Sequence, residues 1–225
     1  MVAEAPGLTG VSGSRLLIGV LDLQGDVREL VAALREVGAR SRLVKAPDEL
    51  RGLDGLILPG GESTTLSMLL ESTGLFDAIA LRLQVGMPVF GTCAGLILLA
   101  RQVLDGRPDQ RTFGALDVVV RRNGYGRQRQ SFEADVVLGS GGGPPLPTVF
   151  IRAPRIESVG EGTQVLAELD GVPVVVSGGG VLASVFHPEL TPDRRLHRFF
   201  AEMCTFDGRP PVPWIDAVDG PEVPA

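Results

Sequence analysis

The chain has 225 residues, of which 44% are hydrophobic and 21% charged, which is long enough for one large globular domain and too apolar for a disordered protein. Its formal net charge of −6 argues against a nucleic-acid partner, and no apolar run is long enough to span a membrane. Two cysteines make no disulfide framework, and neither a Cys-x-x-Cys pair nor a histidine cluster indicates zinc, so we expect a cytoplasmic protein without a metal site.

The first part of the chain alternates apolar strands with helices. Residues 1–14 predict a loose leader without the features of a secretory signal. The predicted strands are 16–21, 41–44, 53–58 and 87–90, and the predicted helices are 26–37, 63–70, 76–84 and one that begins at 96–100. This alternation predicts an α/β fold with a parallel sheet that is covered on both faces.

After residue 105 the pattern changes to short strands separated by turns. These strands are predicted at 114–121, 131–138, 148–151, 164–169, 172–176 and 181–186. Several alternate polar and apolar residues, which favours antiparallel strands added to the sheet or beside it. A Gly/Pro-rich loop at 139–147, a closing helix at 193–204 and a Pro- and acid-rich tail at 207–225 complete the chain, leaving 15–206 as one domain.

The most informative motif is the run Phe-Gly-Thr-Cys-Ala-Gly at 90–95, between a predicted strand and a predicted helix. Glycines two residues before and two residues after Cys93 allow the sharp turn that a nucleophile elbow requires. The start of a helix would also favour the thiolate of Cys93. We therefore predict a cysteine nucleophile; the alternative is a small buried cysteine at a strand-to-helix turn.

A cysteine nucleophile usually needs a base, and the chain has two histidines. His187 directly follows an apolar strand, so it should face the same crevice at the carboxyl ends of the strands as Cys93. Glu189 lies two residues further on, where its carboxylate can orient the imidazole. A structural histidine at a strand end is the alternative for His187. His197 lies among arginines in the closing helix and is predicted to be a solvated helix residue.

An oxyanion site is predicted where the strand 53–58 ends in Pro-Gly-Gly and a helix begins. The glycines let backbone N–H groups approach a ligand, and Ser63 or Thr64 could cap the helix. The N–H groups of Gly61 and Ala94 could together hold a negative oxygen beside Cys93. A plain turn is an equally good interpretation of Pro-Gly-Gly alone.

One basic cluster, at 121–129, stands out in this acidic chain. It is interpreted either as a solvated charge run or as a site that binds a substrate carboxylate or an acidic partner surface.

Together these stretches resemble the class I, triad-type glutamine amidotransferases. Gly-x-Cys-x-Gly and His-Pro-Glu are shared across that class. Within it, the chain from about 15 to 204 closely resembles the glutaminase subunits of pyridoxal 5′-phosphate synthase. This closer resemblance rests on the runs 23–29, 58–65, 91–99, 122–128, 131–133, 150–154 and 186–191.

The resemblance implies a flavodoxin-like, three-layer α/β fold with a mostly parallel central sheet and added antiparallel strands. It implies a catalytic triad of Cys93, His187 and Glu189, and hydrolysis of L-glutamine to glutamate and ammonia without a cofactor. The glutamine contacts that it implies are Gly61, Glu62, Ser63, Arg122, Ile151 and Arg152.

The resemblance also implies a partner, a (β/α)₈-barrel synthase subunit that receives the ammonia within a large hetero-oligomer. The chain departs from the family at Leu30, where a histidine is usual in the motif that begins at residue 23. That motif is expected to lie away from the triad. The alternatives are a triad glutaminase that serves a different synthase, a related cysteine hydrolase on the same fold, and a catalytically silent regulatory subunit.

Overall fold

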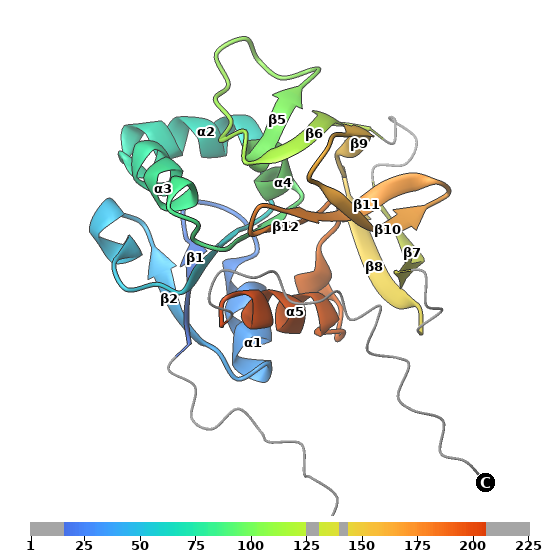
Figure 1. Cartoon of the computed structure of the whole chain (residues 1–225), viewed down its shortest axis with the longest axis horizontal. Coiled ribbons are helices and arrows are strands. Elements are labelled where there is room, and N and C mark those ends of the chain that lie inside the picture. The colour runs from blue at the N-terminus through green and yellow to red at the C-terminus, as the bar shows by residue number, and fades with distance from the viewer. Residues whose placement is uncertain (1–15, 125–130, 140–143, 206–225) are drawn as a thin grey trace, which may run out of the picture.

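A computed structural model describes residues 16–124, 131–139 and 144–205 (Figure 1). The expected leader and tail, the middle of the loop 139–147 and most of the basic cluster 121–129 lie outside the described residues.

The described residues form strands, α-helices and two short 3₁₀ helices. The α-helices are α1 (Val27–Glu36), α2 (Ser63–Ser72), α3 (Leu75–Gln84), α4 (Ala94–Leu99) and α5 (Arg195–Met203), and the 3₁₀ helices are η1 (Pro47–Leu50) and η2 (Pro188–Leu190). The strands are β1 (Leu17–Leu21), β2 (Arg40–Val44), β3 (Gly55–Leu58), β4 (Val89–Thr92), β5 (Ala100–Val103), β6 (Leu116–Arg121), β7 (Ser131–Leu138), β8 (Leu146–Ile151), β9 (Arg155–Val159), β10 (Gln164–Leu169), β11 (Val172–Gly178) and β12 (Val181–Ser184).

The central sheet has a parallel half and an antiparallel half. The parallel half has the order β2-β1-β3-β4-β12, and β11-β10-β7-β8 extend it by antiparallel pairs. With β12 as the fifth strand, the order of the parallel half is that of flavodoxin-like folds. Strands β5, β6 and β9 form a separate small sheet. The predicted fold, with a parallel core and added antiparallel strands, is confirmed.

Helices cover both faces of the parallel half. Helices α1 and α5 lie on one side of the sheet, and α2, α3 and α4 lie on the other (Figure 1). The central strands read as continuous apolar runs because helices cover both of their faces. Within the described ranges, no helix combines the length and apolar character that a membrane span requires.

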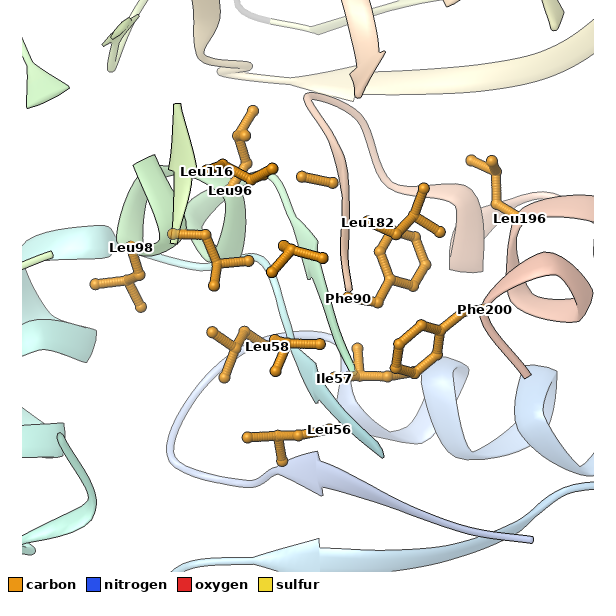
Figure 2. Close-up of a cluster of buried hydrophobic side chains, with 14 of the residues drawn as sticks. Leu56, Ile57, Leu58, Phe90, Leu96, Leu98, Leu116, Leu182, Leu196 and Phe200 are labelled. Atoms are coloured by element: carbon orange, nitrogen blue, oxygen red, sulfur yellow. The ribbon is translucent and has the colours of Figure 1, made fainter. Parts of the chain in front are cut away.

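Apolar residues from the middle strands and both helix layers form the core beneath the strand ends. Figure 2 shows these side chains meeting: Leu56, Ile57 and Leu58 of β3, Phe90 of β4, Leu182 of β12, Leu96 and Leu98 of α4, Leu116 of β6, and Leu196 and Phe200 of α5. All ten are at most 1% exposed. The rings of Phe90 and Phe200 lie 5.7 Å apart between centroids. The strand ends that carry the polar motifs therefore rest on a fully packed base.

Helix α4 is shorter than the sequence predicts. It ends at Leu99, and Ala100 already has extended backbone and begins β5, a strand that the sequence analysis did not predict. Strand β9 was not predicted either. An apolar run such as Leu96–Ala100 suits a buried helix and a buried strand equally, and pairing of β5 with β6 decides the outcome here.

The prediction that His197 is a solvated helix residue is wrong. Its side chain is fully buried on the inner face of α5, where the ring lies edge-on to Phe90 at 6.0 Å between centroids. Neither ring nitrogen has a hydrogen-bond partner among the described residues. Burial disfavours the charged imidazolium, and the positive charge of Arg194 disfavours it further. These two effects outweigh the negative charges of Glu36 and Asp193, so the pKa of His197 falls from 6.5 to about 4.

This buried neutral histidine should make the protein sensitive to acid. The unfolded chain binds a proton at this residue below pH 6.5 while the folded chain does not until about pH 4, so the free energy of unfolding should fall across that interval. The fall attributable to His197 should reach up to about 3 kcal/mol. Urea denaturation of the wild type at several pH values, compared with His197→Leu and His197→Gln, measures it.

Both variants remove the titration, one with an apolar and one with a polar side chain. The stability difference between wild type and each variant should therefore change between pH 6.5 and pH 4. A difference that stays constant over this interval in both variants would contradict the assignment.

Candidate active site

The carboxyl ends of four parallel strands surround one cavity of about 320 Å³. Residues that follow β1, β3, β4 and β12 meet there, as expected at the switch point of a doubly wound sheet. The cavity is lined by Gln24, Gly25, Asp26, Gly61, Glu62, Ser63, Cys93, Ile97, Arg122, Asn123, Ile151, Arg152 and His187. Its volume is at the lower end of the range for small-molecule sites.

Cys93 has the backbone of a nucleophile elbow. It is a non-glycine residue with positive φ (φ 49°, ψ −102°) at the junction of β4 and α4. A Cβ atom on Gly91 would lie 2.6 Å from the carbonyl carbon of Gly95, and one on Gly95 would overlap the carbonyl of Leu58. Both glycines of the motif are therefore required by close backbone packing, which is what holds the turn in its strained conformation.

His187 is fixed from its backbone and from its ring. Its N–H donates to the carbonyl of Val149 on β8 at 3.0 Å, although the residue itself lies just beyond β12. Its ring and the side chain of Cys93 line the same cavity and interact, and its Nδ1 lies 2.9 Å from Oε1 of Glu189. A Cβ atom on Gly60 would collide with the imidazole, so the strand end after β3 packs directly on the ring.

These contacts favour a charged imidazole. Burial of the ring lowers the pKa of His187, but the hydrogen bonds to Cys93 and Glu189 and the negative charge of both outweigh burial and raise it from 6.5 to about 10. At neutral pH the ring is therefore an imidazolium beside the sulfur of Cys93. Helix α4 has only six residues, and the imidazolium places a second source of positive charge near Cys93.

Two carboxylates face Nδ1 of His187. The side chain of Glu189, on η2, is fully buried, and its Oε2 has no partner among the described residues. Oδ2 of Asp26 lies 3.2 Å from the same nitrogen, with the Asp26 side chain 41% exposed. The expectation that the motif beginning at residue 23 lies away from the triad is therefore wrong.

Glu62 and Arg122 form a charged pair at another wall of the cavity. Their side chains meet at 2.5 Å between Oε1 and Nη2. Glu62, rather than the predicted Ser63 or Thr64, caps α2 by accepting from the N–H groups of Thr64 and Thr65. Partial burial raises the pKa of Glu62, but hydrogen bonds from Thr65 and Thr64 and the charge of Arg122 outweigh it and lower the pKa to about 2.

Ile151 and Arg152, at the turn between β8 and β9, also line the cavity. The carbonyl oxygen of Ile151 lies 3.9 Å from Sγ of Cys93. Arg152 has a positive φ of 44°, which is unusual for a non-glycine residue and places this turn under strain.

The two residues predicted to form the oxyanion site are placed differently relative to the cavity. Gly61 lines the cavity with a φ of 144°, a conformation that favours glycine. Ala94 is buried at the first position of α4, directly after Cys93.

Comparison with known proteins agrees with this geometry. The family model of the SNO glutamine amidotransferases matches residues 20–206. The chain belongs to the SNO glutamine amidotransferase family.

Relatives of the chain carry a more specific name. The pyridoxal 5′-phosphate synthase subunit PdxT of Parafrankia sp. is 55% identical over 186 residues, which cover 83% of this chain and 92% of the relative. The subunit of the same name in Streptomyces coelicolor is 54% identical over 187 residues, covering 83% and 93%. A crystal structure of a glutamine amidotransferase, 47% identical, aligns with a TM-score of 0.78 over 83% of this chain and 98% of that chain.

Within this member of the SNO family, sequence reasoning missed several residues of the cavity. These are Gln24, Gly25, Asp26, Ile97 and Asn123. The sequence could have indicated residues 24–26, because they follow the carboxyl end of β1. Ligand sites lie at the carboxyl ends of parallel strands, which is the rule that located Cys93 and His187. Leu30, which replaces the usual histidine, is fully buried on α1 and is not among the residues that line the cavity.

The triad region is also the one group of three potential metal ligands among the described residues. Ligand atoms of Asp26, His187 and Glu189 lie within 4.8 Å of one another. Nδ1 of His187 cannot bind a metal while it donates a proton to Glu189. We therefore assign Nδ1 of His187 to its hydrogen bond with Glu189 rather than to a metal.

Proposed function

We propose that this glutamine amidotransferase hydrolyses L-glutamine to L-glutamate and ammonia through a triad of Cys93, His187 and Glu189. The observation that carries the proposal is the arrangement of three side chains: Cys93 and His187 line one cavity, and Nδ1 of His187 is hydrogen-bonded to the buried carboxylate of Glu189. The same cavity is also lined by a negative side chain, Glu62, and a positive one, Arg122.

The walls of the cavity suit the backbone of a free amino acid. Glutamine carries an ammonium and a carboxylate on its α-carbon, and its side-chain amide must reach Cys93. We assign the ammonium to Glu62 and the carboxylate to the guanidinium groups of Arg122 and Arg152. The low pKa of Glu62 keeps its carboxylate charged at any physiological pH. Gly61, Ser63 and Ile151 supply the remaining contacts along the walls.

The first step forms a thioester. Sγ of Cys93 attacks the side-chain amide carbon of glutamine, and the carbonyl oxygen becomes an oxyanion. The N–H groups of Gly61 and Ala94 stabilise this oxyanion. The imidazolium of His187 gives its proton to the amide nitrogen, the C–N bond breaks, and ammonia leaves.

The second step reverses the proton transfer. The now neutral His187 takes a proton from water as the water oxygen attacks the thioester carbon. The C–S bond breaks, glutamate leaves, and the thiolate of Cys93 again faces an imidazolium. Glu189 holds Nδ1 throughout, which keeps the other ring nitrogen directed at the reacting atoms.

The ammonia requires an acceptor outside this domain. The family match spans residues 20–206, so it accounts for nearly all of the described residues, which include no second catalytic domain. Ammonia released into neutral water would be protonated and lose its nucleophilicity. Because its relatives are named as subunits of pyridoxal 5′-phosphate synthase, we propose that the chain passes ammonia to a (β/α)₈-barrel synthase subunit in a large cytoplasmic hetero-oligomer.

Replacing the nucleophile should abolish the reaction. Cys93→Ala should lower glutamate release from glutamine by about a thousandfold or more, because no other group near His187 can form the thioester. The matched control is Cys204→Ala, since Cys204 packs against Gly55 at the base of β3, outside the cavity lining. That variant should keep its activity. Wild-type glutamate release by Cys93→Ala would contradict the assignment.

Coupling to the synthase is tested by mixing the purified subunits. Glutaminase activity should be weak for the chain alone and rise when a barrel synthase subunit is added, because productive hydrolysis is useful only when an acceptor is in place. Co-purification of the two chains is the accompanying binding measurement. Equal activity with and without the barrel subunit would count against coupling.

A further inference from the structure

Asp26 makes a contact that the triad does not require. Its Oδ2 lies 3.2 Å from Nδ1 of His187, the nitrogen that also lies 2.9 Å from Glu189. The two carboxylates come from separate elements, one at the start of α1 and the other in η2. The contact with Glu189 has the geometry of a hydrogen bond, whereas the contact with Asp26 is an ion-pair contact with the same ring nitrogen.

The position of Asp26 in its helix supports a role directed at His187. Asp26 is the N-cap residue of α1, where an aspartate normally accepts a hydrogen bond from a backbone N–H of the first turn. Its side chain makes no such bond. The carboxylate is therefore unused by its own helix, and the ring of His187 is the partner it does have.

The loop before α1 is held against the strand end that packs on the imidazole. Gly25 has a φ of 107°, and a Cβ atom there would overlap the carbonyl oxygen of Gly60. Oε1 of Gln24 accepts from the N–H of Glu62 at 3.2 Å. These backbone contacts place Asp26 beside His187 independently of any capping interaction.

We propose that Asp26 is a positioning residue, a second carboxylate that pairs with the His187 imidazolium beside Glu189 and keeps the ring charged and oriented. This inference rests on the proposed triad. The groups that face the ring are Cys93 from the elbow, Glu189 from η2 and Asp26 from α1. Glu189 is sealed from solvent, whereas Asp26 supports the ring from the side that opens to water.

The test is Asp26→Asn in the full chain, assayed together with the barrel subunit. Asparagine caps helices as well as aspartate does, so α1 should begin unchanged while the negative charge is lost. We expect kcat to fall about three- to tenfold with little change in KM for glutamine. The alkaline limb of the kcat profile should move to lower pH by about 0.5 to 1 unit, because the imidazolium loses one of its two anionic partners.

The matched control is Asp22→Asn on the same loop. The carboxylate of Asp22 pairs with Lys45 at 3.0 Å and does not line the cavity, so kcat and its pH profile should be unchanged. A wild-type pH profile in Asp26→Asn would overturn the proposal. So would an equal change in the Asp22 control, which would indicate a general effect of loop charge.

A double-mutant cycle shows whether the two carboxylates act together on His187 or independently. In Glu189→Gln, Asp26 is the remaining carboxylate at Nδ1, so adding Asp26→Asn should lower kcat more than it does in the wild type. An effect of the same size in both backgrounds would contradict joint action on the ring. The Cys93→Ala variant distinguishes failure of the proposed function from failure of the role of Asp26. Glutaminase activity in Cys93→Ala would overturn the proposed function itself. If Cys93→Ala is inactive and Asp26→Asn has wild-type kinetics, only the role of Asp26 is overturned.

Discussion

The imidazole of His187 is the group on which the rest of the site depends. Its ring lies at the cavity that Cys93 also lines, and its Nδ1 faces two carboxylates, one of them fully buried. In the mechanism that we propose, an imidazolium in this position carries the proton that the departing ammonia needs. The ring itself follows β12, and it is contacted by Asp26 after β1, Gly60 after β3, Cys93 after β4 and Glu189 on η2, so residues distant in sequence converge on it.

Close backbone packing is what makes those contacts possible. Gly60 lies against the ring, Gly91 and Gly95 let β4 and α4 meet at the elbow, and Gly25 lets the β1 loop touch Gly60. Each glycine serves the approach of one backbone segment to another or to the ring. The fully packed core beneath these strand ends gives the turns a rigid base (Figure 2). The chain thereby holds Cys93 in a strained conformation that an isolated turn would not keep.

Much of this arrangement could be predicted from sequence, because its signals are local. The strand-to-helix turn at Cys93, the strand end at His187 and the Pro-Gly-Gly turn can be predicted from spacing, and the parallel direction of the strands follows from the alternation of strands and helices. The failures concern features that depend on neighbours distant in the chain. The arginines beside His197 suggested a solvated residue, but the position of α5 over Phe90 buries it. Likewise β5 exists because β6 pairs with it, and Asp26 resembles an ordinary helix cap until the fold brings His187 to it.

The protonation state of His187 tests the central claim most directly. The chain has two histidines, so nitrogen-15 NMR of the ring nitrogens over a range of pH can follow both, with His197 as an internal reference that is neutral down to about pH 4. Our account predicts that both ring nitrogens of His187 carry protons at neutral pH and that the ring titrates near pH 10. A His187 that titrates at its ordinary value of 6.5 or below would contradict it.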